Sequence, residues 1–166
     1  LEGQVSYPKL NKDILSKLNF KGKLGSTCFI NCEETLYLLY GLGKKDDLKP
    51  FQITETGAKI AAELISARQA QATVLVPTLS FDGCPKKTSL ELAFGIGLRN
   101  YAFDKYKTKQ KEPTFFIESV TLVSDHVTDS DFFEKQALIS GVHMTRDLMH
   151  EPPNVLYPAS FCAQIQ

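Results

Sequence analysis

The sequence lacks an excess of charge of either sign, a long apolar run and a signal segment. Its 19 basic and 19 acidic side chains give a net charge of zero, which excludes a general electrostatic attraction to nucleic acid or to an anionic membrane. Its apolar runs are only a few residues long, whereas a membrane-spanning helix needs about 20. The basic, apolar and small-residue order of a secretory signal is also missing at the start. We therefore expect a soluble cytoplasmic protein with no membrane partner.

Cysteine is scarce, and no Cys-x-x-Cys motif is present. The chain has four cysteines, at Cys28, Cys32, Cys84 and Cys162. On one strand Cys28 and Cys32 would lie about 13 Å apart, which is too far for a disulfide. We interpret all four as reduced packing residues of a cytosolic protein rather than as a redox pair.

Strand and helix patterns alternate along the 166 residues, which are enough for one domain or for one domain and the beginning of another. Short runs rich in β-forming residues predict strands at 27–31, 36–41, 72–79 and 114–123. Apolar residues at helical spacing predict helices over 11–18, 57–69, 88–103 and 130–150. This order is typical of the α/β class, with a mixed β-sheet flanked by helices.

Local signals suggest where the helices begin and which sides they bury. Thr56 is expected to cap the second helix, and Thr88 with Glu91 forms a capping-box pattern at the start of the third. In the last helix, acidic residues near the start and basic residues near the end complement the helix dipole. Its buried side is expected to carry Leu138, Val142 and Met149.

The most concentrated set of potential ligands lies near the end of that helix, at Asp147, His150 and Glu151. A zinc peptidase helix needs two His residues on one face with a Glu between them. Here only one His is present, and Pro152 and Pro153 stop the helix where a second ligand would stand. We therefore interpret the segment as a helix end followed by a hinge at the two prolines.

The other motifs are weak. GLGKK at 41–45 lacks the spacing of a phosphate-binding loop, which favours a turn that ends a strand. The run 95–97 (Gly-Ile-Gly) lies inside a predicted helix, which favours close helix packing over dinucleotide binding. The serines lack a Gly-x-Ser-x-Gly context, and the three histidines are scattered. The residues themselves therefore predict no catalytic site.

One basic cluster remains, formed by Lys105, Lys107, Lys109 and Lys111 with Tyr106 among them. Basic residues interleaved with an aromatic ring permit a nucleic-acid contact. In a chain of zero net charge we favour the plainer interpretation that these are lysines of a solvated loop.

Two segments resemble a known family. YAFDKYKTKQKEP (101–113) and GVHMTRDLMHEPPNVLYPASF (141–161) are similar to the corresponding stretches of the leucyl (cytosol) aminopeptidases, which are two-metal exopeptidases. LYLLYGLGKKDDL (36–48) resembles the strand of that family that ends in Gly-Leu-Gly-Lys. In order and spacing the resemblance spans essentially the whole chain.

The resemblance implies a non-catalytic N-terminal α/β domain, similar to the macro fold, over residues 1–128. A connecting helix over 129–151 would lead to a hinge and the beginning of a catalytic domain over 152–166. In the family the two divalent metal ions (manganese or zinc) and the catalytic residues lie in that second domain, so no catalytic or metal residue is carried over to this chain. The chain has no initial Met and lacks the opening strand of the family, so we interpret it as a fragment trimmed at both ends.

The resemblance also implies partners. The domain would work beside its own C-terminal catalytic domain, in a cytoplasmic homo-hexamer that acts on peptides. The alternative is a binding module, either for nucleic acid through the lysine cluster or for ADP-ribose, which relatives of the macro fold bind.

Overall fold

The protein is seen in a computed structural model that describes residues 17–32, 35–44, 48–76, 85–109, 113–124 and 127–165. Its chain divides into two compact units, residues 1–49 and 50–166. Several sequence predictions lie outside the described residues: most of the helix at 11–18, the cysteine at 84, Lys111 and the end of the strand at 72–79. Within the described part of the chain, no helix is both long enough and apolar enough to cross a membrane.

The first unit contains an antiparallel pair of strands, β1 (Thr27–Cys32) and β2 (Thr35–Tyr40). Their register runs from Thr27 opposite Tyr40 to Cys32 opposite Thr35. The strands predicted at 27–31 and 36–41 are thereby confirmed. Both runs are rich in β-branched and aromatic residues, which suit a pleated surface.

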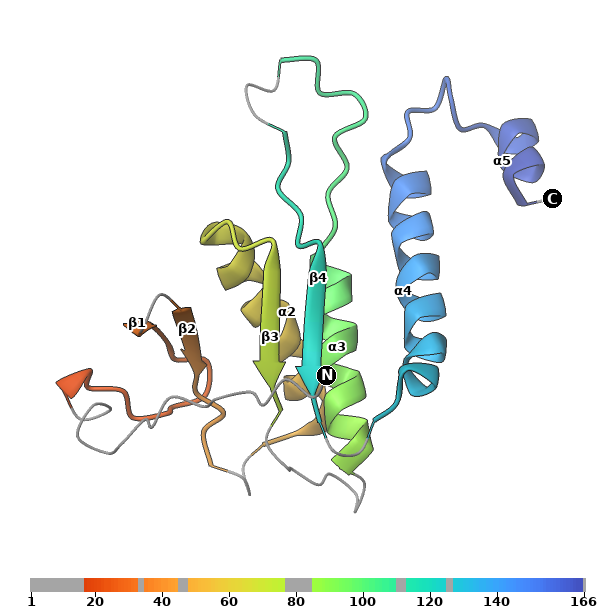
Figure 1. Cartoon of the computed structure of the whole chain (residues 1–166). Coiled ribbons are helices and arrows are strands. Elements are labelled where there is room, and N and C mark those ends of the chain that lie inside the picture. The colour runs from red at the N-terminus through yellow and green to blue at the C-terminus, as the bar shows by residue number, and fades with distance from the viewer. Residues whose placement is uncertain are drawn as a thin grey trace, which may run out of the picture. The chain divides into compact units, whose positions relative to one another are not determined.

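The second unit places helices against a small parallel sheet (Figure 1). Strands β3 (Gln71–Leu75) and β4 (Ser119–Val123) pair in parallel, with Gln71 opposite Ser119. The helices are α2 (Pro50–Ser66), α3 (Pro85–Arg99), α4 (Asp129–His150) and α5 (Pro158–Ile165). Helix α3 packs against both α2 and α4. The α/β class is therefore confirmed, with small sheets flanked by helices.

The core of this unit lies mainly where α2 meets α3. The buried apolar side chains of the two helices are Ile53, Ile60, Ala61, Leu64, Leu92, Ala93 and Ile96. Helical spacing predicts a buried stripe on α2 made of Ile60, Ala61, Leu64 and Ile65. The first three are buried, and Ile65 is half-buried.

Glycines let these two helices approach at backbone distance. A Cβ placed on Gly57 would overlap the carbonyl oxygen of Leu92, and a Cβ on Gly95 would overlap that of Thr54. A Cβ on Gly97 would overlap the side chain of Ile139 in α4. The prediction that the 95–97 run serves close helix packing is confirmed.

The predicted starts of α2 and α3 are wrong, whereas α4 begins within one residue of its predicted start. Thr56 lies inside α2, where its buried hydroxyl donates to the carbonyl of Gln52 (2.7 Å). Thr88 is likewise buried inside α3. Each helix begins earlier, with a proline at its first position, where the missing N–H removes no helical hydrogen bond. The threonines resemble caps in the sequence because Ser and Thr occur both at helix caps and inside helices.

The boundaries between α3 and β4 also differ from the prediction. Helix α3 ends at Arg99 instead of continuing to residue 103, and β4 begins at Ser119 instead of 114. The reason is a pair of hydrogen bonds, which we call the clasp. The Asn100 side chain donates to the carbonyl of Ile117 (2.8 Å) and accepts from its amide (2.9 Å). These two bonds replace the hydrogen bonds that a neighbouring strand would make with Ile117.

Helix α4 has the predicted length, but its buried side is wrong. Leu138 and Met149 are exposed, and Val142 is only half-buried. The side that faces α3 carries Ile139, which meets Gly97, together with two long polar residues. Lys135 donates to Glu91 (2.6 Å), and Arg146 donates to the carbonyl of Leu98 (2.7 Å). Long cationic side chains can cover apolar surface with their stems while their charged ends find partners.

Candidate functional site

The end of α4 meets the loop that follows α3, and we call residues 101–106 together with 146–153 the joint. Asp147 accepts a hydrogen bond from the Tyr101 hydroxyl (2.8 Å). Glu151 accepts one from Lys105 (2.7 Å) and another from the Tyr106 hydroxyl. Both carboxylates therefore point to partners more than 40 residues earlier in the chain.

The rings and the cations of the joint complete its packing. The His150 ring stacks on Phe103 at 5.1 Å between centroids, and its Nδ1 lies 2.7 Å from the Arg146 carbonyl oxygen. The Arg146 guanidinium lies over the Tyr101 ring at 5.3 Å. Because Arg146 also donates to Leu98, it satisfies a carbonyl in the last turn of α3 that has no partner within that helix.

The pKa directions in the joint follow from these bonds. The hydrogen bonds from Lys105 and Tyr106 lower the pKa of the Glu151 carboxyl. In return, the hydrogen bond to Glu151 raises the pKa of Lys105 and that of Tyr106. Glu151 is thus a carboxylate held in a local network. It is not positioned as a general acid or as a metal ligand.

The three potential metal ligands of the 147–151 segment contact other residues rather than one another. Asp147 contacts Tyr101, His150 contacts Arg146 and Phe103, and Glu151 contacts Lys105. Across the described ranges, no three His, Cys, Asp or Glu side chains gather in a way that could hold a metal ion.

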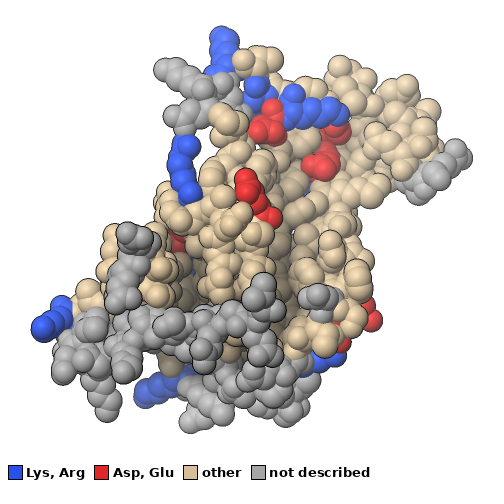
Figure 2. All heavy atoms as spheres, in the orientation of Figure 1, with Lys and Arg blue, Asp and Glu red and all other residues tan. Residues whose placement is uncertain are grey.

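The three described lysines of the cluster differ in their surroundings. Lys105 is paired with Glu151, while Lys107 and Lys109 are exposed. Figure 2 shows acidic side chains next to basic ones in the region of this loop. A phosphate-binding surface would need several free cations, and one of the candidates is already neutralised by a carboxylate.

A second set of polar contacts holds the beginning of α4. Asp131 accepts hydrogen bonds from the Thr128 amide (2.9 Å) and from Lys86 of α3. The hydrogen bond from Lys86, followed by those from Thr128, lowers the pKa of Asp131 from its ordinary 3.8 to about 2. This carboxylate therefore stabilises both the helix start and its contact with α3.

One turn further along, Glu91 of α3 accepts from Lys135 (2.6 Å) and from Thr54 of α2 (2.8 Å). Burial raises the pKa of Glu91, but the two hydrogen bonds outweigh it and leave the pKa lowered. This carboxylate joins three helices, so its position is explained by the fold.

The Asp131 contacts predict a dependence of stability on pH. A carboxyl whose folded pKa is depressed stabilises the fold above its unfolded pKa, and that contribution is lost as the pH falls towards the folded pKa. Between about pH 4 and pH 2, urea unfolding should therefore show a smaller loss of stability in Asp131→Asn than in the unmodified chain. The control is Glu134→Gln, which is exposed on the same helix. Equal pH slopes in Asp131→Asn and the unmodified chain would contradict this assignment.

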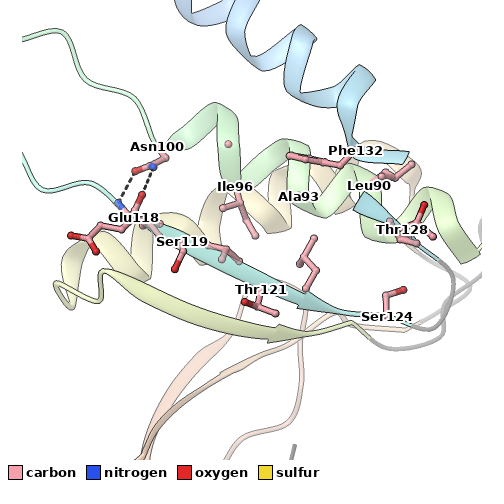
Figure 3. Close-up of a pocket in the computed structure, with 15 residues that line it drawn as sticks. Leu90, Ala93, Ile96, Asn100, Glu118, Ser119, Thr121, Ser124, Thr128 and Phe132 are labelled. Carbon is pink, nitrogen blue, oxygen red and sulfur yellow. Dashed lines mark hydrogen bonds between the residues drawn. The ribbon is translucent and has the colours of Figure 1, made fainter. Parts of the chain in front are cut away.

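The described part of the second unit also contains an apolar groove of about 470 Å³ between α3 and β4 (Figure 3). Ala93 and Ile96 of α3 lie on one side, and Phe132 of α4 closes one end. Two of the polar residues that line it are hydrogen-bonded: Asn100 is bonded to Ile117, and Ser124 accepts from Ser89 (2.9 Å). The only ionisable residue among the described lining is Glu118. The described lining therefore contains no histidine or cysteine that could act as a base or nucleophile.

In the first unit the GLGKK turn packs on an earlier glycine turn. Gly43 donates to the carbonyl of Gly22 (2.9 Å), and Gly25 donates to that of Gly41 (2.9 Å). A Cβ on Gly41 would overlap the carbonyl oxygen of Lys23, and Gly43 has a φ of +73°. These glycines are needed for close approach and for a left-handed backbone. The interpretation as a strand-ending turn is thereby confirmed.

Comparison with known proteins places these features in a family context. The N-terminal domain model of the cytosol aminopeptidase family matches residues 6–110. A probable cytosol aminopeptidase of Rhodopseudomonas palustris (strain BisA53) is 36% identical over 149 residues, which cover 86% of this chain and 30% of that protein. The cytosol aminopeptidase of Rickettsia prowazekii (strain Madrid E) is 31% identical over 171 residues, covering 98% of this chain and 34% of that protein. The chain thus spans about a third of the length of the curated relatives that it matches.

Solved structures agree in fold. A tomato leucine aminopeptidase mutant has a TM-score of 0.72 at 21% identity, over 90% of this chain and 30% of that chain. The bottromycin maturation enzyme BotP in complex with Mn has a TM-score of 0.73 at 16% identity, over 98% of this chain and 33% of that chain. At these identities the likeness shows the fold alone. None of these similar proteins is named as a nucleic-acid or ADP-ribose binding protein, so the comparisons do not support that alternative.

Proposed function

The chain belongs to the cytosol aminopeptidase family as its N-terminal domain, and we propose that it serves a longer leucyl aminopeptidase as a non-catalytic domain. The intact protein would release N-terminal residues from peptides. Its two divalent ions, manganese or zinc, would be held by the catalytic domain. The observation that carries the proposal is the match of the family's N-terminal domain to residues 6–110, beside relatives about three times as long.

Within this proposal the chain has three parts. Residues 1–128 form the N-terminal domain, 129–151 the connecting helix, and 152–166 the hinge at Pro152 and Pro153 with the beginning of the catalytic domain. The contacts of Asp147 and Glu151 support a mechanical role for the end of the helix, because they attach it to the loop after α3. We further propose a cytoplasmic homo-oligomer, a hexamer, as the working form.

The test is an aminopeptidase assay with a leucyl-anilide substrate and added manganese or zinc. We expect turnover by the polypeptide that carries this domain together with its catalytic domain, and no turnover above background by the 166 residues alone. Removing metal from the longer polypeptide with a chelator should abolish turnover, and adding manganese or zinc should restore it. Turnover by the 166 residues, or stoichiometric metal in them, would contradict the proposed division between the domains.

A further inference from the structure

Helix α4 exposes large apolar side chains along its outer side. Phe133 is 67% exposed, Leu138 55%, Met144 48% and Met149 79%. Helical spacing places them in two rows, Phe133 with Met144 and Leu138 with Met149. Only small or short side chains lie between the rows near the middle of the helix, at Ala137, Gly141 and Thr145. We call these seven residues the outer face.

The outer face is not needed to hold α4 on its own domain. The opposite side of the helix makes those contacts, through Lys135 to Glu91 and through Arg146 to the carbonyl of Leu98. Isolated exposed apolar residues are ordinary on a protein surface, but several in one contiguous patch mark an interaction site.

Gly141 is a second, independent observation. Glycine inside a helix is less favourable than alanine by about 1 kcal/mol. Gly57, Gly95 and Gly97 are explained by neighbours that leave no room for a Cβ. Gly141, in contrast, has open space around it. A glycine on the outer face is explained if a partner outside these residues approaches the helix backbone there.

The area of the outer face distinguishes two candidate occupants, a second copy of this chain and a domain of the same polypeptide. Helix α4 has 22 residues and is about 33 Å long, so a stripe about 10 Å wide offers roughly 300 Å². A stable complex between separate chains buries about 800 Å² on each partner, which argues against a second copy on this face alone. A domain joined to the helix by a short linker has an effective concentration in the millimolar range, so a smaller contact suffices.

Large apolar side chains are also exposed in the segment that follows α4. After Pro152 and Pro153, the segment around α5 exposes Val155, Tyr157 and Phe161. In Figure 2 the surface in the region of α4 and α5 is mostly uncharged. We propose that the outer face of α4 is the docking surface for the catalytic domain of the same polypeptide, with Gly141 at the point of closest approach. This inference rests on the proposed function.

The test uses the only methionines of the chain, Met144 and Met149, which both lie on the outer face. Dilute hydrogen peroxide oxidises exposed methionine to the sulfoxide, and mass spectrometry follows both sites. In the 166-residue chain both should react readily. In the polypeptide with its catalytic domain they should react about tenfold more slowly, which corresponds to a docking free energy of about 1.4 kcal/mol.

Two variants of the longer polypeptide test whether the protection from oxidation depends on the outer face. In the longer polypeptide, Leu138→Lys should restore fast oxidation, while Gln136→Lys, an exposed position beside the outer face, should keep the protection. Equal oxidation rates in the short and the long polypeptide would overturn the inference. Protection that appears in the short chain, or disappears on dilution of the long one, would assign the face to another copy and also overturn it. Failure of the proposed function is read separately, from the turnover of the unmodified longer polypeptide.

Discussion

Gly95→Ala is expected to destabilise the 166-residue chain by about 3 kcal/mol or more. The added methyl group would overlap the carbonyl oxygen of Thr54, and the Ala58 amide nitrogen lies only 3.0 Å from the Cβ position. Both obstacles belong to the backbone of α2, so no side chain can rotate away. The helices would have to separate, which would open the core around Ile53 and Leu92. Such a loss is a large fraction of the total stability of a typical domain, about 5–15 kcal/mol.

Gly141→Ala provides the matched control, since it makes the same substitution inside a helix. There the methyl group meets open space. The change should therefore stabilise the chain by about 0.5–1 kcal/mol, through the higher helix propensity of alanine. Urea unfolding followed by circular dichroism measures both variants. If the two variants shifted the unfolding midpoint equally, the close approach of α2 and α3 would not be the reason for Gly95.

The class of the fold could be predicted because its signals are local. Strands β1 and β2 follow from runs of β-forming residues, and the length of α4 follows from its charge order and the prolines after it. The helix starts could not be predicted in the same way. A threonine beside a helical pattern resembles a cap, and only the backbone shows that α2 and α3 begin several residues earlier.

The inner side of α4 was mispredicted for a physical reason. The pattern predicts that Leu138, Val142 and Met149 face the domain, whereas Ile139 and two long cations make the contacts with α3. Lys135 and Arg146 lie there because their partners, Glu91 and Leu98, present a carboxylate and a helix-end carbonyl. Those partners are more than 40 residues away in sequence. A periodicity argument cannot find them, so it placed Leu138 and Met149 on the buried side of the helix although both are exposed.

The joint was predicted in part. The prolines after His150 indicated the end of α4, and the single histidine argued against a zinc site. The partners of Asp147 and Glu151 have no local signal, since the sequence pattern places Tyr101 in the predicted helix 88–103 and Lys105 in a basic loop. Asn100 was missed altogether, because one asparagine after a helix is an ordinary end signal.

Asn100→Ala is the second change expected to have a large effect, about 2–4 kcal/mol. The side chain satisfies both the amide and the carbonyl of Ile117, whose residue is buried. Alanine would leave both backbone groups without this partner, and a buried polar group without a hydrogen bond costs about 1–3 kcal/mol. Asn100→Asp keeps an acceptor for the amide but loses the donor, so its effect should be intermediate.

Two measurements separate this effect from a general loosening of the fold. Urea unfolding gives the loss of stability, and amide hydrogen exchange at Ile117 should rise most in Asn100→Ala. Asn154→Ala, in an exposed turn after the two prolines, is the control and should leave both unchanged.

Because Tyr101 follows Asn100 directly and donates to Asp147, the loss of the Asn100 hydrogen bonds should also loosen the joint. Cleavage of the 152–157 segment by a protease should then be faster in Asn100→Ala than in the unmodified chain, and an unchanged rate would show that the clasp and the joint are independent.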